Sequence, residues 1–88
     1  RYTAGIFRKR YAMSEIHCRV DARQLDCPLP LLKAKQALNR MASGEVVEVL
    51  ATDVGSQRDF AVFAAQSGNT LLLDEERQGE FRYLLQKK

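Results

Sequence analysis

The sequence predicts an α/β (α+β) two-layer sandwich, in which two helices pack on one face of a mixed four-stranded sheet. Two segments with apolar residues at three- and four-residue spacing alternate with short segments of strand character. Turns that contain Gly44, Gly55, Gly68 or Gly79 separate the later segments, and the order of the segments is βαβαββ. Such alternation favours one sheet with both helices on the same side. A chain of 88 residues makes one domain at most, and we expect that domain over residues 13–88.

Four segments have strand character. In the first, Ile16, Cys18 and Val20 alternate with polar residues, which is typical of a half-buried strand. The second, EVVEVLAT, is β-branched and nearly continuous, which indicates a central strand. The last three strands are expected over residues 45–52, 69–74 and 81–86, with a loop over 75–80.

Two segments have helical spacing. The first is expected over residues 29–41, with Gly44 just past its end and an opposite, solvated face formed by Lys33, Gln36 and Arg40. The second is expected over residues 56–67. There Ser56 and Asp59 resemble a capping box, and we expect Asp53 and Asp59 to have turn and cap roles. The apolar positions of the two helices are Leu31, Ala34, Leu38, Met41, Phe60, Phe63 and Ala64.

The net positive charge of the chain comes from its first twelve residues. Of the 14 Lys and Arg residues, four lie in residues 1–12, which contain no acidic residue, so residues 13–88 hold 10 basic and 11 acidic residues. Because a natural start is expected at Met13, we interpret residues 1–12 as a leader or tag. The domain itself therefore lacks the basic footprint of a nucleic-acid-binding protein. No apolar run approaches the roughly 20 residues of a membrane span, and no secretory signal is evident, so a cytoplasmic protein without membrane insertion is expected.

The stretch Gln24–Leu32, QLDCPLPLL, bears the candidate chemistry. Proline is tolerated in the first turn of a helix, so Pro28 and Pro30 mark the helix start and place Cys27 at or next to its N-cap. A helix N-terminus favours an anion and lowers the pKa of a cysteine. Arg23 and Lys33 could add positive potential. The sequence thus predicts a rigidly presented, exposed and activated thiol.

Other interpretations of the cysteines stay open. Cys27 could be a small apolar residue before an ordinary helix start, and Cys18 is expected to be an inert core residue. His17 could be a base or a ligand but is expected to be solvated. Two cysteines and one histidine fall short of the usual zinc site, so no metal or cofactor is expected. A lone thiolate suits sulfur transfer through a persulfide, or redox sensing through a disulfide with Cys18.

The chain resembles the TusA-like (SirA-like) sulfur-carrier family. The residues that carry the resemblance are Asp21, Leu25, the CPxP motif Cys27–Pro30, Gly44–Glu45, Asp53, Asp59, Gly68, Leu71–Leu72 and Lys87, and it covers residues 15–88. At Gln24 the family usually has glycine. The resemblance implies the βαβαββ sandwich and a Cys27 that accepts sulfane sulfur as a persulfide, with Pro28 and Pro30 positioning the thiol.

The resemblance also implies partners. A cysteine desulfurase or a rhodanese-like protein would supply the sulfur, and a downstream protein would accept it, as in relays that end in tRNA thiolation. Lys33, Lys35 and Asp53 are the candidates for partner contact. The alternative is a non-catalytic module that binds RNA or a regulatory protein, although direct nucleic-acid binding is not expected at this charge balance.

Overall fold

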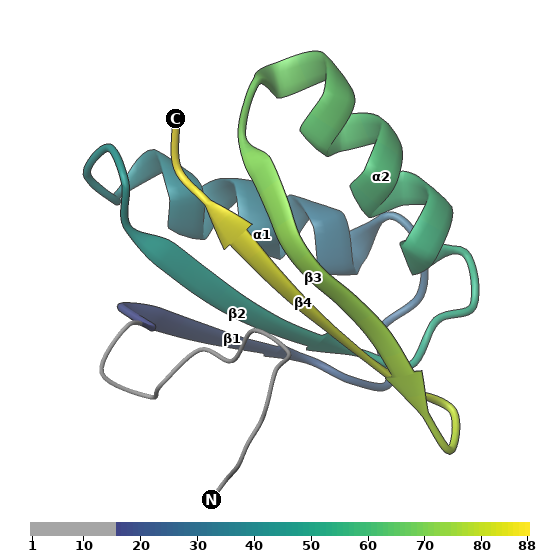
Figure 1. Cartoon of the computed structure of the whole chain (residues 1–88). Helices are drawn as coiled ribbons and strands as arrows, with labels where there is room; N and C mark the ends of the chain where they lie inside the picture. Colours follow the sequence, from purple (N-terminus) through teal and green to yellow (C-terminus); the bar gives the residue numbers. More distant parts are fainter. Residues whose placement is uncertain (1–15) are drawn as a thin grey trace, which may run out of the picture.

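A computed structural model describes residues 16–88; the expectations on residues 1–12 lie outside this part of the chain. The element order is βαβαββ, as the sequence predicts. The elements are β1 (Cys18–Ala22), α1 (Leu29–Asn39), β2 (Val46–Ala51), α2 (Ser56–Ser67), β3 (Thr70–Arg77) and β4 (Glu80–Gln86). Both helices lie on the same side of the sheet (Figure 1).

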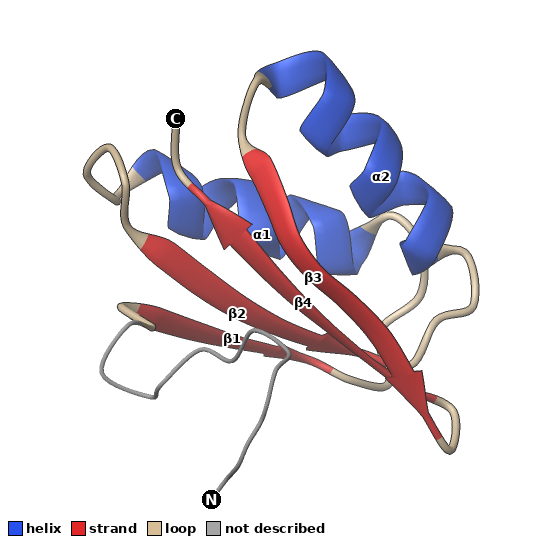
Figure 2. Ribbon diagram, viewed as in Figure 1, coloured by secondary structure: helices blue, strands red, loops and turns tan. Residues whose placement is uncertain are grey.

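The sheet has the strand order β1-β2-β4-β3 and is mixed (Figure 2). Strand β1 pairs with β2 in parallel, and β4 pairs antiparallel with both β2 and β3. Helix α1 connects the two parallel strands, as parallel pairing requires a crossover. In this arrangement Ala22 and Ala51 are paired, so the loops that follow β1 and β2 leave the sheet at the same edge.

The core lies between the sheet and the helices. Strand β2 is buried on both faces, which confirms that EVVEVLAT forms a central strand. The largest buried side chains are Tyr83 and Phe60, whose rings stack with centroids 4.4 Å apart. The Ser56 and Tyr83 hydroxyl groups share a hydrogen bond of 2.6 Å, and burial raises the pKa of Tyr83 to about 12. Phe60 and Ser56 are the buried residues of α2, so this cluster attaches the helix to the sheet.

The expected capping box at Ser56 is wrong. The N-cap of α2 is Gly55, and no side chain caps the helix. The Ser56 hydroxyl instead bonds Tyr83 in the core, because Ser56 is 1% exposed and a buried hydroxyl requires a partner.

The expected loop over residues 75–80 is also wrong. Strand β3 continues to Arg77, and β4 begins at Glu80. Gln78 and Gly79 have φ values of 54° and 84°, so the two residues between the strands form a tight turn with positive φ at both positions. This turn type matches the twist of paired strands and therefore suits a two-residue hairpin loop. Helix α1 is also slightly shorter than expected, because it ends at Asn39 and not at Met41.

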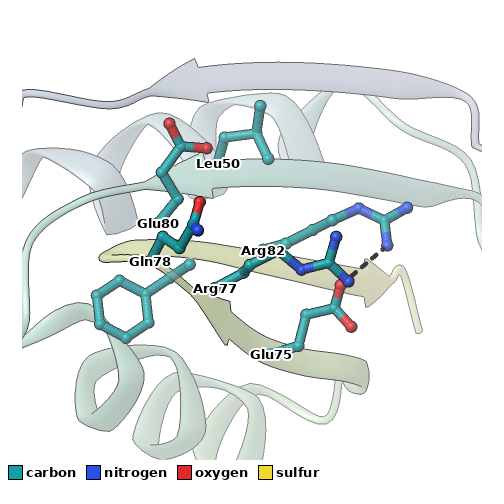
Figure 3. A pocket seen from close by; sticks show the side chains of 7 residues that line it. Leu50, Glu75, Arg77, Gln78, Glu80 and Arg82 are labelled. Atoms are coloured by element: carbon teal, nitrogen blue, oxygen red, sulfur yellow. Dashed lines mark ion pairs between the residues drawn. The ribbon is translucent and has the colours of Figure 1, made fainter.

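The face of the sheet opposite the helices carries paired charges. Glu48, whose side chain is 7% exposed, lies 2.9 Å from Arg19 and 2.6 Å from Arg82. A hollow of about 310 Å³ lies beside the β3–β4 turn, where Arg82 also pairs with Glu75 at 3.6 Å (Figure 3). The guanidinium groups of Arg19 and Arg82 are thus engaged by carboxylates.

No helix of residues 16–88 is long and apolar enough to span a bilayer.

Candidate functional site

Cys27 lies in the loop between β1 and α1 and is exposed. Pro28 is the N-cap of α1, so Cys27 directly precedes the cap. The turn is closed by the Leu29 N–H, which donates to the Asp26 carbonyl at 2.8 Å. Pro30 is buried in the first turn of the helix. The two prolines thus lie where the sequence predicts them, one capping the helix and one fixing its first turn against the core.

The loop before Cys27 contains a left-handed residue. Gln24 has a φ of 70°, a conformation that glycine adopts most easily, and its N–H donates to the Thr52 hydroxyl at 2.8 Å. The turn therefore keeps the backbone shape that a glycine at this position would favour. The hydrogen bond joins the Cys27 loop to the end of β2.

Two carboxylates converge on the thiol. The Cys27 Sγ–H group donates to Asp59 Oδ2 at 3.0 Å. Ligand-type atoms of Cys27, Asp53 and Asp59 all lie within 4.8 Å of one another. The three residues come from the β1–α1 loop, the β2–α2 loop and the first turn of α2. The expectation that turn and cap roles suffice for these two aspartates is wrong.

This grouping could in principle have been foreseen. Parallel strands joined by a crossover helix end at the same edge of a sheet, so the residues that follow β1 and β2 meet there. Asp53 and Asp59 follow β2 as Cys27 follows β1. The five residues between the aspartates conceal their proximity, because they include the start of α2.

The expected low pKa of Cys27 is wrong. The hydrogen bond to Asp59, with burial and the negative charges of Asp59 and Asp53, raises the pKa of the Cys27 thiol. The N-terminus of α1 stabilises a thiolate less than the sequence predicts, because Pro28 and Pro30 lack the N–H groups that would otherwise do so. The resting thiol is therefore a hydrogen-bond donor.

The positive potential that Arg23 and Lys33 were expected to add at Cys27 does not act on the thiol. Arg23 pairs with Asp21 at 2.9 Å and with Glu80 at 3.4 Å, and the bond from Arg23 lowers the pKa of Asp21 to about 2. Lys33 and Lys35 are exposed on α1. The Lys35 ammonium lies 5.4 Å from the centroid of the Phe63 ring. Neither lysine contributes to the shift of the Cys27 pKa, whereas Asp53, the third partner-binding candidate, belongs to the thiol cluster.

Cys18 and His17 lie away from this cluster. Cys18 is paired with Val47, four residues before the Ala22–Ala51 pair, so it lies about 13 Å along β1 from the edge that Cys27 occupies. Both cysteines are free thiols, and a disulfide needs Cα atoms closer than about 7 Å. Cys18 packs against the core, as expected. His17 Nδ1 accepts a hydrogen bond from the Val46 N–H at 3.2 Å and so helps to pair the strands.

One thiol and two carboxylates are the sole group of three potential metal ligands within residues 16–88. Structural zinc sites use four Cys or His ligands, and this set supplies one. The arrangement instead suits an exchange at sulfur, because the thiol is exposed and has a proton acceptor in contact.

Comparisons with known proteins agree with the fold and the motif. A family model described as Sulfurtransferase TusA matches residues 19–87. The sulfur carrier protein TusA of Allochromatium vinosum is 48% identical over 75 residues, which cover 85% of this chain and 99% of that protein. The sulfur carrier protein TusA of Pseudomonas putida is 36% identical over 69 residues, which cover 78% of this chain and 86% of that protein.

A solved structure is similar as well. The crystal structure of the SirA-like protein from Desulfitobacterium hafniense matches with a TM-score of 0.72 at 26% identity, covering 80% of this chain and 96% of that one. Sequence and structure thus agree over nearly all of the described residues. This chain belongs to the TusA family.

Proposed function

We propose that this chain is a sulfur carrier that accepts sulfane sulfur as a persulfide on Cys27 and passes it to a partner protein. The observation that carries the proposal is the exposed Cys27 thiol, held before the N-cap of α1 and hydrogen-bonded to Asp59. The curated relatives at 48% and 36% identity are named sulfur carriers, which supports the same role here.

The surroundings of the thiol suit a protein partner. Leu29 and Leu32, in the first turn of α1, are 43% and 47% exposed, and Val54, next to Asp53, is 83% exposed. Exposed apolar side chains at one edge of the sheet favour contact with another protein. A carrier needs two such contacts in turn, one with a sulfur donor and one with an acceptor. The donor we propose is a cysteine desulfurase or a rhodanese-like protein.

The acceptor would belong to a sulfur relay, in tRNA thiolation or another sulfur-trafficking pathway. Lys33 and Lys35, both exposed on α1, are proposed as partner contacts, since they lie on the same helix that presents Cys27. A role in direct RNA binding is not supported, because residues 13–88 carry 10 basic and 11 acidic residues and phosphate contacts require clustered Lys or Arg.

The test is the mass of the intact protein after incubation with a cysteine desulfurase and free cysteine. We expect a gain of one or more sulfur atoms, lost again on treatment with a reducing thiol. Omission of the desulfurase serves as the control and should give no gain. A protein that stays at its original mass while the desulfurase turns over cysteine would contradict the carrier role.

A further inference from the structure

We propose that Asp59 is the proton acceptor for Cys27 during sulfur transfer, and therefore a catalytic residue of the carrier. The assignment rests on the proposed function and adds to it the group that accepts the thiol proton. Asp59 Oδ2 lies 3.0 Å from Cys27 Sγ, which is close enough for a direct proton transfer.

The carboxylate is rigidly supported. Asp59 lies in the first turn of α2, and its N–H donates to the Gly55 carbonyl at 3.1 Å. The next residue, Phe60, is fully buried and stacks on Tyr83. Asp59 is itself partly buried, which restricts its side chain, whereas Cys27 is exposed. A base held in this way keeps its geometry toward the sulfur without reorganisation.

The charges around the thiol require such a base. A thiolate at Cys27 would face the carboxylates of Asp59 and Asp53. The sulfur therefore stays protonated at rest and must lose its proton as it attacks.

Asp59 is favoured over Asp53 by the hydrogen bonds. Asp53 Oδ2 is buried and has no hydrogen-bond partner among the described residues, whereas Asp59 accepts directly from the thiol. His17 is engaged with Val46, at the opposite end of β2 from Asp53. Asp59 is thus the group in contact with the thiol proton.

The transfer balances without an added oxidant or reductant. The Cys27 S–H bond breaks and its proton moves to Asp59 Oδ2, while the Cys27 sulfur attacks the outer sulfur of a donor persulfide, R–S–SH. A new S–S bond forms at Cys27 and the donor S–S bond breaks. The leaving donor thiolate takes the proton from Asp59. The products are Cys27–S–SH and R–SH, and Asp59 is a carboxylate again.

The test uses Asp59→Asn, which keeps the shape of the side chain and removes the base. Two rates are measured at pH 7: alkylation of Cys27 by iodoacetamide, and sulfur uptake from cysteine persulfide, a small donor that needs no protein docking. Loss of the carboxylate removes the main cause of the raised pKa of Cys27, so alkylation should become faster than in the wild type. Sulfur uptake should nevertheless become at least about 10-fold slower, since a general base typically contributes more than that.

Matched variants complete the experiment. Asp26→Asn removes an equal charge next to Cys27 in the loop, and both rates should stay within about twofold of wild type. Asp59→Glu retains a carboxylate and should take up sulfur faster than Asp59→Asn. The alkylation rate of the wild-type protein should rise with pH, with a midpoint above the ordinary cysteine value of about 8.5, and Asp59→Asn should lower that midpoint.

Three results would overturn the assignment. If Asp59→Asn accelerates both alkylation and sulfur uptake, the carboxylate only lowers the thiolate fraction of Cys27 and does not act as a base. If its sulfur uptake equals that of the wild type, Asp59 has no part in the transfer. If the wild-type protein takes up no sulfur, the proposed function fails and this assignment fails with it. The wild-type rate therefore distinguishes the failure of one proposal from the failure of both.

Discussion

Cys27→Ser is expected to reduce sulfur uptake to the background measured without a donor. A serine hydroxyl has nearly the same shape as the thiol and can still donate to Asp59, but it forms no persulfide. The substitution is at an exposed position in a loop, so the free energy of unfolding should change by less than about 0.5 kcal/mol. The measurement is the mass of the intact variant after incubation with a cysteine desulfurase and free cysteine.

Cys18→Ser is the matched control because it removes the other thiol. Cys18 packs against the core and lies at the far end of β1 from Cys27, so this variant should load sulfur as the wild type does. Equal uptake by Cys27→Ser and the wild type would show that Cys27 is not the carrier. Loss of uptake in Cys18→Ser, in a protein that remains folded, would indicate that both thiols take part.

Phe60→Ala is expected to lower the free energy of unfolding by about 3–5 kcal/mol. Phe60 is fully buried, stacks on Tyr83 with ring centroids 4.4 Å apart, and is one of the two buried residues of α2. Its removal leaves a cavity at the point where α2 is attached to the sheet. A small domain is stable by only about 5–15 kcal/mol, so a large share of its stability would be lost. Chemical denaturation followed by circular dichroism measures the change.

The control for Phe60→Ala is Val62→Ala on the same helix. Val62 is 46% exposed, so its truncation should change the free energy of unfolding by less than about 0.5 kcal/mol. A loss below about 1 kcal/mol for Phe60→Ala would show that α2 is attached by other contacts. Because Asp59 precedes Phe60, the loosened helix should also weaken the Cys27–Asp59 contact and accelerate alkylation of Cys27.

The fold was predictable because its elements have strong local patterns. The continuous β-branched run of β2 identifies a central strand, and the helical spacing in α1 identifies a face that packs on the sheet. The β3–β4 hairpin was missed because its turn is Gln78–Gly79, whereas the usual signal is Asn or Asp before Gly. Charged residues in the second half of β3 also resemble a loop, since this part of the strand is exposed on the sheet.

The position of the Cys27 thiol could be predicted from the sequence, but the carboxylates around it could not. The two prolines locate the helix start, and hence Cys27, from local rules alone. The contact with Asp59 spans 32 positions in the sequence and depends on where α2 packs. The sign of the pKa shift followed from that contact, so a local argument about the helix N-terminus predicted the opposite direction. Long-range geometry, and not residue type, decides the protonation of this thiol.

We expect Cys27 Sγ to be the atom that carries the sulfur. The most direct test is peptide-level mass spectrometry of the wild-type protein, loaded by a desulfurase and capped with iodoacetamide before digestion. We predict that the additional sulfur appears on the peptide that contains Cys27, with the peptide that contains Cys18 unchanged. Additional sulfur on Cys18, or on neither cysteine while the donor is active, would show that Cys27 is not the sulfur-carrying residue.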